Sequence, residues 1–133
     1  MTRERFQEYL TRFNNNDPGF IEFYHDDVVL DLRGTEIRGA RGILDFYRPV
    51  KEHLRETVEV THFVADATGV AAEIPTEFRC IKDWGPDNFF QRRLTVGEVL
   101  RVVSFGLYWV QDGRFSRIKA ARYKLVNDWR LEP

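Results

Sequence analysis

Large apolar side chains near the N-terminus recur at the spacing of a helix. Four of them lie three or four residues apart, so one face of the segment from about Thr2 to Asn14 is apolar. This pattern predicts a first helix that packs through that face. The residues of the face are Phe6, Tyr9, Leu10 and Phe13.

A second, short helix is expected directly after the first. Asp17 offers a capping oxygen, and Pro18 suits the first helical turn, which predicts a helix from Pro18 to about His25. A β-prone segment from Val28 to Leu32 follows and ends at Arg33-Gly34. The N-terminal part therefore combines two helices with one strand.

A third helix is marked by apolar residues that keep helical spacing over about three turns. Gly39 and Gly42 stand at its entry, and Pro49 lies inside it. Because proline lacks the backbone N–H and its ring clashes with the preceding turn, we expect a kink or a break there. The apolar residues of this helix are Ile43, Phe46, Tyr47, Val50 and Leu54.

From Glu56 onward the apolar residues alternate, and the rest of the chain is predicted to form four long strands. The second of them alternates apolar and polar residues from Ala72 to Cys80, and Pro75 within it indicates an edge or a bulge. The first strand carries four residues on one face. These are Val58, Val60, His62 and Val64.

The segment from Asp83 to Gly97 is rich in turn-forming residues but carries three large aromatic side chains. We expect it to cover part of the interior. The third strand, Glu98 to Gln111, is apolar on both faces, which is typical of a strand covered on both sides. Asp112-Gly113 then predicts a tight turn into a last strand, Phe115 to about Leu125.

The composition indicates one folded domain over residues 1–133. Hydrophobic residues make up 43% and charged residues 31%, which excludes a disordered chain. Aromatic residues make up 14%, with eleven Phe, enough to form the walls of a pocket for an apolar ligand. The net charge of −1 provides no general attraction to nucleic acid or to an anionic membrane, so we expect neither as a partner.

Cysteine content and hydropathy bear on the cellular compartment of the protein and on whether it binds a metal. Cys80 is the only cysteine, which excludes an internal disulfide and a multi-cysteine metal site. The three histidines lack metal-ligand spacing, and we expect no metal and no cofactor. The longest apolar run, Val102 to Val110, is too short to span a bilayer, and the N-terminus lacks the apolar stretch of a secretory signal. A cytoplasmic protein is therefore expected.

Several short segments accompany this order of elements: Asn16-Asp17, Tyr24-His25-Asp26-Asp27-Val28-Val29, Gly42-Ile43 with Phe46-Tyr47, and Val110-Gln111-Asp112-Gly113-Arg114-Phe115. Over nearly the whole chain they resemble the nuclear transport factor two superfamily. That superfamily includes ketosteroid isomerase, scytalone dehydratase, limonene epoxide hydrolase and the SnoaL-like polyketide cyclases. The resemblance implies an α+β fold in which a cone-shaped, curved mixed β-sheet packs on three N-terminal helices and encloses a pocket.

Tyr9, Tyr24 and Tyr47 fall at the positions of three tyrosines that form a hydrogen-bonded network in ketosteroid isomerase. The resemblance implies that Tyr9 is the oxyanion donor. When a base removes a proton beside a carbonyl, charge develops on the oxygen, and a buried phenol stabilises that charge most in the transition state.

The catalytic carboxyl groups of these enzymes are matched less well. The base of ketosteroid isomerase aligns with Leu32, so Asp31 is offset by one residue and would point away from the pocket unless a bulge restores it. The second carboxyl aligns with Gly106, and the catalytic Asp of limonene epoxide hydrolase aligns with Ala120. The sequence therefore argues against both activities.

The catalytic candidates are Tyr9, Asp31 and His62, and each has a structural alternative. Tyr9 also belongs to the apolar face of the first helix, where a core tyrosine is equally expected. His62 could act as base or acid, or it could be a hydrogen-bonded core histidine. Asp31 could be the base or an exposed residue near a strand end.

Further residues are expected to line the pocket. Arg122 shares a strand face with Ile118 and Ala120, and the resemblance implies that this face points inward. Arg122 could therefore receive an anionic or carbonyl group of a ligand, or pair with an acid such as Asp31. The expected ligand-binding residues are Tyr24, Tyr47, Thr76, Phe78, Ser104, Tyr108 and Arg122.

These observations lead to two hypotheses. In the first, the chain is a cofactor-independent isomerase, cyclase or dehydratase that acts by acid–base chemistry on a small apolar carbonyl or hydroxyl compound, polyketide-, terpenoid- or steroid-like. In the second, it is a ligand-binding or assembly module with the same pocket and no chemistry. In both, the apolar outer face of the strand from Val99 to Trp109 predicts a homodimer.

Overall fold

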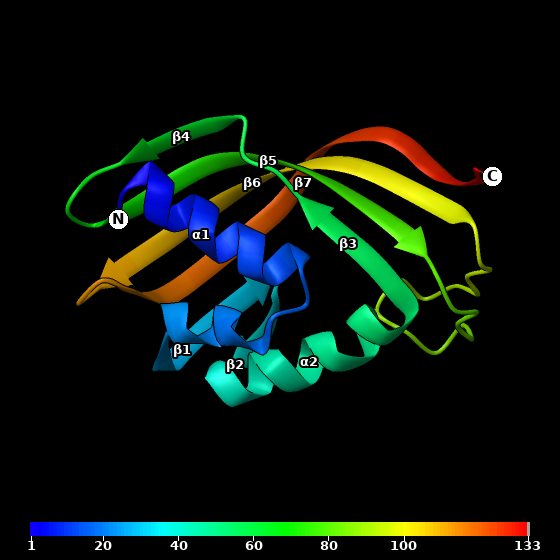
Figure 1. Cartoon of the computed structure of the whole chain (residues 1–133), viewed down its shortest axis with the longest axis horizontal. Coiled ribbons are helices and arrows are strands. Elements are labelled where there is room, and N and C mark those ends of the chain that lie inside the picture. Colours follow the sequence, from blue (N-terminus) through cyan, green and yellow to red (C-terminus); the bar gives the residue numbers. More distant parts are fainter. Residues whose placement is uncertain (133) are drawn as a thin grey trace.

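The structure, a computed structural model, describes residues 1–132, and its sheet curls into a half-barrel around the N-terminal helices (Figure 1). The sheet order is β2-β1-β7-β6-β5-β3, with β4 also paired to β5; β1 and β7 are parallel and the other pairs antiparallel. This mixed, curved sheet confirms the predicted α+β cone. The elements are α1 (Arg3–Asn14), the 3-10 helix η1 (Pro18–Phe23), β1 (Tyr24–Leu32), β2 (Thr35–Arg38), α2 (Ala40–His53), β3 (Leu54–Val58), β4 (His62–Ala65), β5 (Gly69–Cys80), β6 (Glu98–Gln111) and β7 (Arg114–Leu131).

The first two helices begin at side-chain caps. The hydroxyl oxygen of Thr2 accepts a hydrogen bond from the backbone N–H of Arg5 at 3.1 Å, and Asp17 accepts one from Gly19 at 2.8 Å. Helix η1 ends at Phe23, before the predicted end, because Tyr24 already has extended backbone and belongs to β1. The first helix is confirmed, and the second is shorter than predicted.

Of the predicted kink or break at Pro49, the break is wrong, because helix α2 continues through this residue. Pro49 removes the helical partner of the Asp45 carbonyl, but both residues are exposed, and water can solvate that carbonyl. The carbonyl of Pro49 itself accepts a hydrogen bond from Nδ1 of His53 at 2.8 Å. Solvent exposure therefore explains why the helix tolerates the proline.

The sequence does not predict β2. Arg33 and Gly34 both have positive φ, 56° and 92°, and form a tight turn that reverses the chain. The following residues, Thr35–Arg38, pair antiparallel with β1 at the sheet edge. Most of them are exposed, which explains the missing apolar signal.

A β-bulge separates β3 from β4 where one strand was predicted. Val58 pairs with Thr76 and His62 pairs with Glu73. Three residues, 59–61, therefore lie opposite two residues of β5, 74 and 75. The extra residue reverses the alternation of side chains beyond it. As a result Phe63, and not His62, packs against the core.

The long strands β5, β6 and β7 form the centre of the sheet. Pro75 lies opposite the bulge, as its position in the sequence predicts, and its carbonyl accepts a hydrogen bond from Glu59 at 2.9 Å. Strand β6 has the predicted bounds. Strand β7 runs to Leu131, beyond the predicted end at Leu125, and pairs with β6 along its length.

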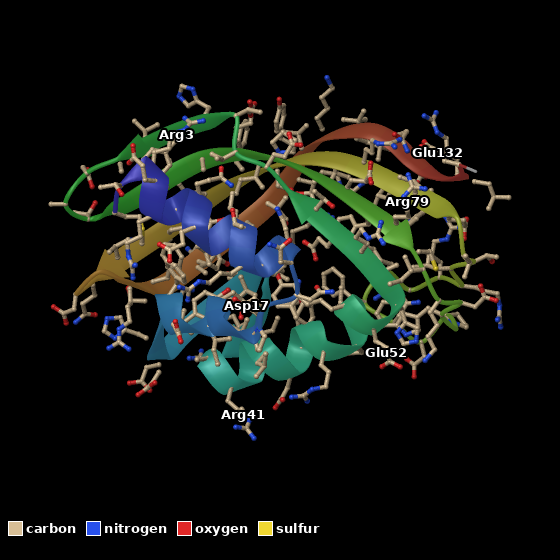
Figure 2. All side chains as sticks on the ribbon, in the orientation of Figure 1. Arg3, Asp17, Arg41, Glu52, Arg79 and Glu132 are labelled. Carbon is tan, nitrogen blue, oxygen red and sulfur yellow. The ribbon has the colours of Figure 1, made fainter. Side chains whose placement is uncertain are left out.

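The two faces of this sheet differ. Its concave face packs on α1 and η1 through a buried, mainly aromatic core. The outer face of β6 leaves Phe105, Leu107 and Trp109 exposed by 51%, 48% and 39%. Charged side chains such as Arg41 and Glu52 project from the outside of the molecule (Figure 2). Within residues 1–132, no helix has the length and apolarity needed to cross a membrane.

Candidate functional site

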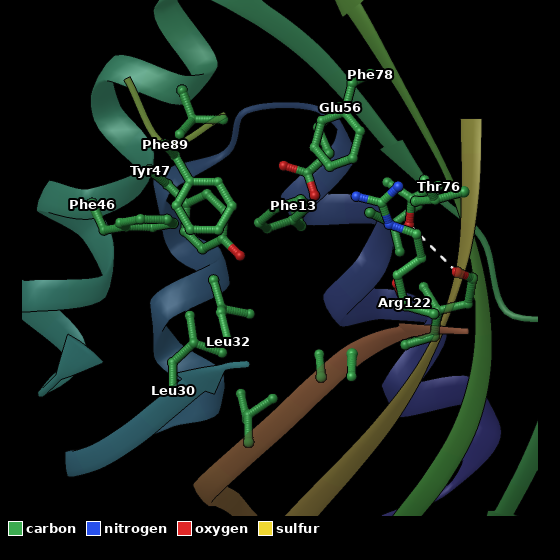
Figure 3. A pocket seen from close by; sticks show the side chains of 18 of the residues that line it. Phe13, Leu30, Leu32, Phe46, Tyr47, Glu56, Thr76, Phe78, Phe89 and Arg122 are labelled. Carbon is green, nitrogen blue, oxygen red and sulfur yellow. Dashed lines mark hydrogen bonds between the residues drawn. The ribbon is translucent and has the colours of Figure 1, made fainter. Parts of the chain in front are cut away.

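A cavity of about 620 Å³ lies between the concave face of the sheet and helices α1 and α2 (Figure 3). This volume is typical of small-molecule sites. Phe89 and Phe90, from the aromatic segment between β5 and β6, line the cavity, as expected for a segment that covers the interior. The exposed lining residues mark the mouth, and they are Arg33, Thr35, Phe89, Gln91, Ala121 and Arg122.

Most of the predicted site residues meet in this cavity. Tyr9 comes from α1, Tyr24 from β1 and Tyr47 from α2, so three separate elements bring the tyrosines together. The expected ligand-binding side chains also line the cavity, on the inward faces of the central strands. These are Thr76, Phe78, Ser104, Tyr108 and Arg122.

The hydroxyl groups of Tyr9 and Tyr24 form a buried hydrogen bond of 2.7 Å. One hydroxyl donates to the other, so the pair keeps one O–H that can donate to a ligand. Burial raises the pKa of both phenols well above its ordinary value, and burial does the same for Tyr47 and Tyr108. These tyrosines therefore stay neutral and act as donors.

Glu56 is the acid that the cavity contains. It lies on β3 between Leu54 and Val58, both buried, and strand alternation directs its side chain inward (Figure 3). Its Oε1 atom is buried and has no hydrogen-bond partner among the described residues. Burial raises the pKa of Glu56 to about 7, against the opposing effect of the Lys51 charge.

Lys51 acts on Glu56 from the end of α2 without contacting it as an ion pair. Its Nζ donates hydrogen bonds to the Phe13 carbonyl at 2.7 Å and to Asn16 Oδ1 at 3.2 Å, and it lies 3.7 Å from the centre of the Phe13 ring. Burial lowers the pKa of Lys51. The ammonium is thus held by Phe13 of α1 and by Asn16 just after it, outside the cavity lining.

Asn14 fixes the strand that carries Glu56. Its amide nitrogen donates to the Val58 carbonyl at 2.8 Å, and its amide oxygen accepts from the Val58 N–H at 2.8 Å. The side chain therefore replaces a strand partner at the point where β3 ends. The last residue of α1 holds β3 in place beside the cavity.

The prediction that Asp31 or His62 joins Tyr9 in the cavity is wrong. Leu30 and Leu32 point inward, so Asp31 points outward, where its Oδ1 accepts a hydrogen bond from Gly34 at 2.7 Å. His62 is exposed because the bulge turns it away from the core. Neither side chain lines the cavity.

Sequence reasoning missed Glu56, although a signal was present. Leu54, Glu56 and Val58 alternate, which marks a single acid on an inward face. The structure also explains Gly106: a Cβ there would lie 2.7 Å from the Tyr108 ring and 3.1 Å from its hydroxyl. The phenol of Tyr108 thus occupies the space that a side chain at position 106 would need.

Three or more His, Cys, Asp or Glu side chains do not gather in a metal-binding arrangement within residues 1–132. The charged residues that line the cavity are Arg33, Glu56 and Arg122. The carboxyl group of Glu56 is suited to proton transfer, and the two guanidinium cations are suited to anion binding.

Comparisons with known proteins agree with this architecture. A candidate polyketide cyclase from Pseudomonas putida KT2440 is 20% identical, with 92% of this chain and 90% of that chain covered and a TM-score of 0.74. An LEH-like epoxide hydrolase from M. tuberculosis is 20% identical, with 88% of this chain and 78% of that chain covered and a TM-score of 0.70. A candidate ketosteroid isomerase from Kribbella flavida DSM 17836 is also 20% identical, with 98% of this chain and 82% of that chain covered and a TM-score of 0.66. At this identity the likeness establishes the fold alone.

A search of curated proteins gives no match. Residues 6–118, most of the chain, match the SnoaL-like domain. Together with the fold, this match shows that the protein belongs to the SnoaL-like family.

Proposed function

We propose that the protein is a cofactor-independent acid–base enzyme, an isomerase, cyclase or dehydratase, for a small apolar carbonyl or hydroxyl compound. The observation that carries the proposal is Glu56, a carboxyl group with a buried, unpartnered oxygen in an aromatic cavity. Its pKa of about 7 means that both protonation states are populated near neutral pH. Such a group can take up and return a proton in one catalytic cycle.

The cavity contains both a group that can move a proton and a group that can stabilise the charge that develops on the carbonyl oxygen. The carboxylate of Glu56 takes a proton from the carbon beside a carbonyl, and the electron pair moves to the carbonyl oxygen. The free O–H of the Tyr9–Tyr24 pair donates a hydrogen bond to that oxygen. The Glu56 acid then returns the proton to another carbon, which isomerises the compound, or to a leaving hydroxyl, which dehydrates it.

A ligand-binding module without chemistry is the second candidate. The observation that favours it is the loss of carboxyl groups at three positions that carry catalytic acids in related enzymes, Leu32, Gly106 and Ala120. In that case the cavity would hold the same class of compound unchanged. The two candidates differ in whether Glu56 exchanges a proton with the ligand.

Deuterium exchange into ketones tests the proposal without knowledge of the product. The protein is incubated in heavy water with a panel of cyclic and polyketide-like ketones, and mass spectrometry follows the exchange. We expect Glu56→Gln to lower the rate about 100-fold or more. Tyr9→Phe should lower it by about tenfold to 100-fold. Glu59→Gln, which removes a nearby exposed carboxylate, should leave the rate unchanged.

Two results would change the conclusion. Exchange that survives Glu56→Gln excludes Glu56 as the base. Ketones that bind to the wild type without exchange support the binding module instead.

We also propose that two copies pair through the outer face of β6. The exposed side chains of Phe105, Leu107 and Trp109 support this arrangement, because a contiguous apolar face is unfavourable in water. Sedimentation velocity at micromolar concentration should give a dimer. A monomer there, or a dimer unaffected by Leu107→Lys, would contradict this interface.

A further inference from the structure

The cavity has an unusual charge for a protein whose formal net charge is −1. Its charged lining residues are Arg33, Arg122 and Glu56. Glu56 carries at most one negative charge, while both guanidinium groups stay positive at any physiological pH. The cavity lining is therefore positive overall.

Arg122 differs from two other arginines of the central sheet, Arg101 and Arg117. Arg101 forms ion pairs with Glu77 and Glu132, and Arg117 forms one with Glu36 at 3.1 Å. Arg122 forms neither an ion pair nor a side-chain hydrogen bond with any described residue. Asp31 points outward, so the alternative in which Arg122 pairs with that acid is not observed, and the donors of Arg122 are free to bind a ligand.

The guanidinium of Arg122 extends from β7 into the cavity, on the side where Thr76 and Glu56 also enter (Figure 3). Arg122 lies directly opposite Ser104 of β6 in the antiparallel register, so the two side chains share the concave face. The Ser104 hydroxyl also lines the cavity. A hydroxyl beside a guanidinium provides the donors that a carboxylate requires.

We propose that the cavity binds an apolar organic acid, whose carboxylate lies against Arg122 and Ser104 while its apolar body fills the aromatic interior. This inference deepens the proposed function and rests on it for the reaction, which then acts on a keto acid or hydroxy acid. The mouth, where Arg122 is exposed, leaves the charged end partly hydrated, and the apolar walls desolvate the remainder.

Calorimetric titration with a matched pair of unreactive probes tests the charge preference. Naphthoate and naphthamide share one apolar body and differ in the negative charge. We expect the wild type to bind naphthoate about tenfold more tightly than naphthamide, as a charge-assisted hydrogen bond allows. Arg122→Met should abolish this preference and leave naphthamide binding unchanged, and Arg122→Lys should keep most of it.

Two control variants separate Arg122 from general electrostatics. Lys124→Met removes an exposed positive charge from the same strand outside the cavity, and it should keep the preference. Arg33→Met removes the other arginine of the mouth, and it should reduce the preference less than Arg122→Met does.

Several outcomes overturn the inference. These are equal binding of the two probes by the wild type, no naphthoate binding at millimolar concentration, and a preference that survives Arg122→Met. Because the titration measures binding alone, its failure is distinguishable from failure of the proposed catalysis. Loss of exchange in Glu56→Gln would leave catalysis supported even if the acid preference were absent.

Discussion

Two carboxylic acids in this protein have opposite surroundings. At the end of β7, both carboxylate oxygens of Glu132 accept hydrogen bonds from Arg101, at 2.5 and 2.7 Å, and Arg130 adds another at 3.0 Å. These bonds lower the pKa of Glu132 to about 2, whereas burial raises the pKa of Glu56 to about 7. A carboxylate with charged partners keeps its charge, and one enclosed by aromatic rings can change its charge at neutral pH.

The largest effect on stability is expected from removal of the buried acid. Because the pKa of Glu56 rises on folding, the folded state binds its proton more tightly than the unfolded state does. Stability should therefore fall as pH rises from about 4.5 to about 7, and stay level above that. Glu56→Gln should remove this slope and raise the free energy of unfolding above neutral pH by up to about 3 kcal/mol.

Urea denaturation at a series of pH values measures this effect. Glu59→Gln, at an exposed position of the same edge, should keep the wild-type slope. If wild type and Glu56→Gln show the same pH dependence, Glu56 does not titrate differently in the folded state.

Removal of the Lys51 charge should enlarge the difference between the pKa values of Glu56 and Glu132. Lys51 lowers the pKa of Glu56, so Lys51→Met should raise that pKa further, by up to about one unit. A carbon-13 NMR titration of the Glu56 carboxyl measures the change. Lys51→Arg, which keeps the positive charge, should retain most of the wild-type value. An unchanged midpoint in Lys51→Met would show that the two charges do not interact.

The smallest effect is expected at the paired acid. The pKa of Glu132 is lowered in the folded state, so its contribution to stability is present above about pH 4.5 and is lost as pH falls toward 2. Glu132→Gln should lower the Tm at neutral pH, by less than Glu56→Gln raises it, and the difference should vanish in acid. Asp87→Asn, at an exposed loop position, provides the control. A difference that persists in acid would point to packing and not to charge.

The elements that local spacing determines could be predicted from the sequence. Helix α1 follows from its apolar face, and β6 from an apolar run between a glycine and a tight turn. Alternation along β7 places Arg122 on the face of Ile118 and Ala120, and the family resemblance implies that this face points inward. Tyr9 and Tyr24 could be placed together only through the family resemblance, because they come from separate elements.

The residues that sequence reasoning misplaced depend on pairing between strands. Leu54 fits the helical spacing before it as well as the alternation after it, so the alternation of Leu54, Glu56 and Val58 did not by itself fix the start of β3 or the inward direction of Glu56. The bulge before His62 arises from the register with β5, which no local pattern reveals. Asp31 points outward because β1 keeps regular alternation there.

The bulge between β3 and β4 is also a site where the loss of one codon from the gene should be tolerated. Deletion of one residue among 59–61 would leave the same number of residues on this edge as on the facing part of β5, so β3 and β4 would join into one regular strand. Phe63 would keep its partner on β5 and its place in the core. The same deletion inside β5 would turn every later side chain of that strand to the other face. We therefore expect length variation among descendants of this sequence to be tolerated at the bulge and rejected within β5.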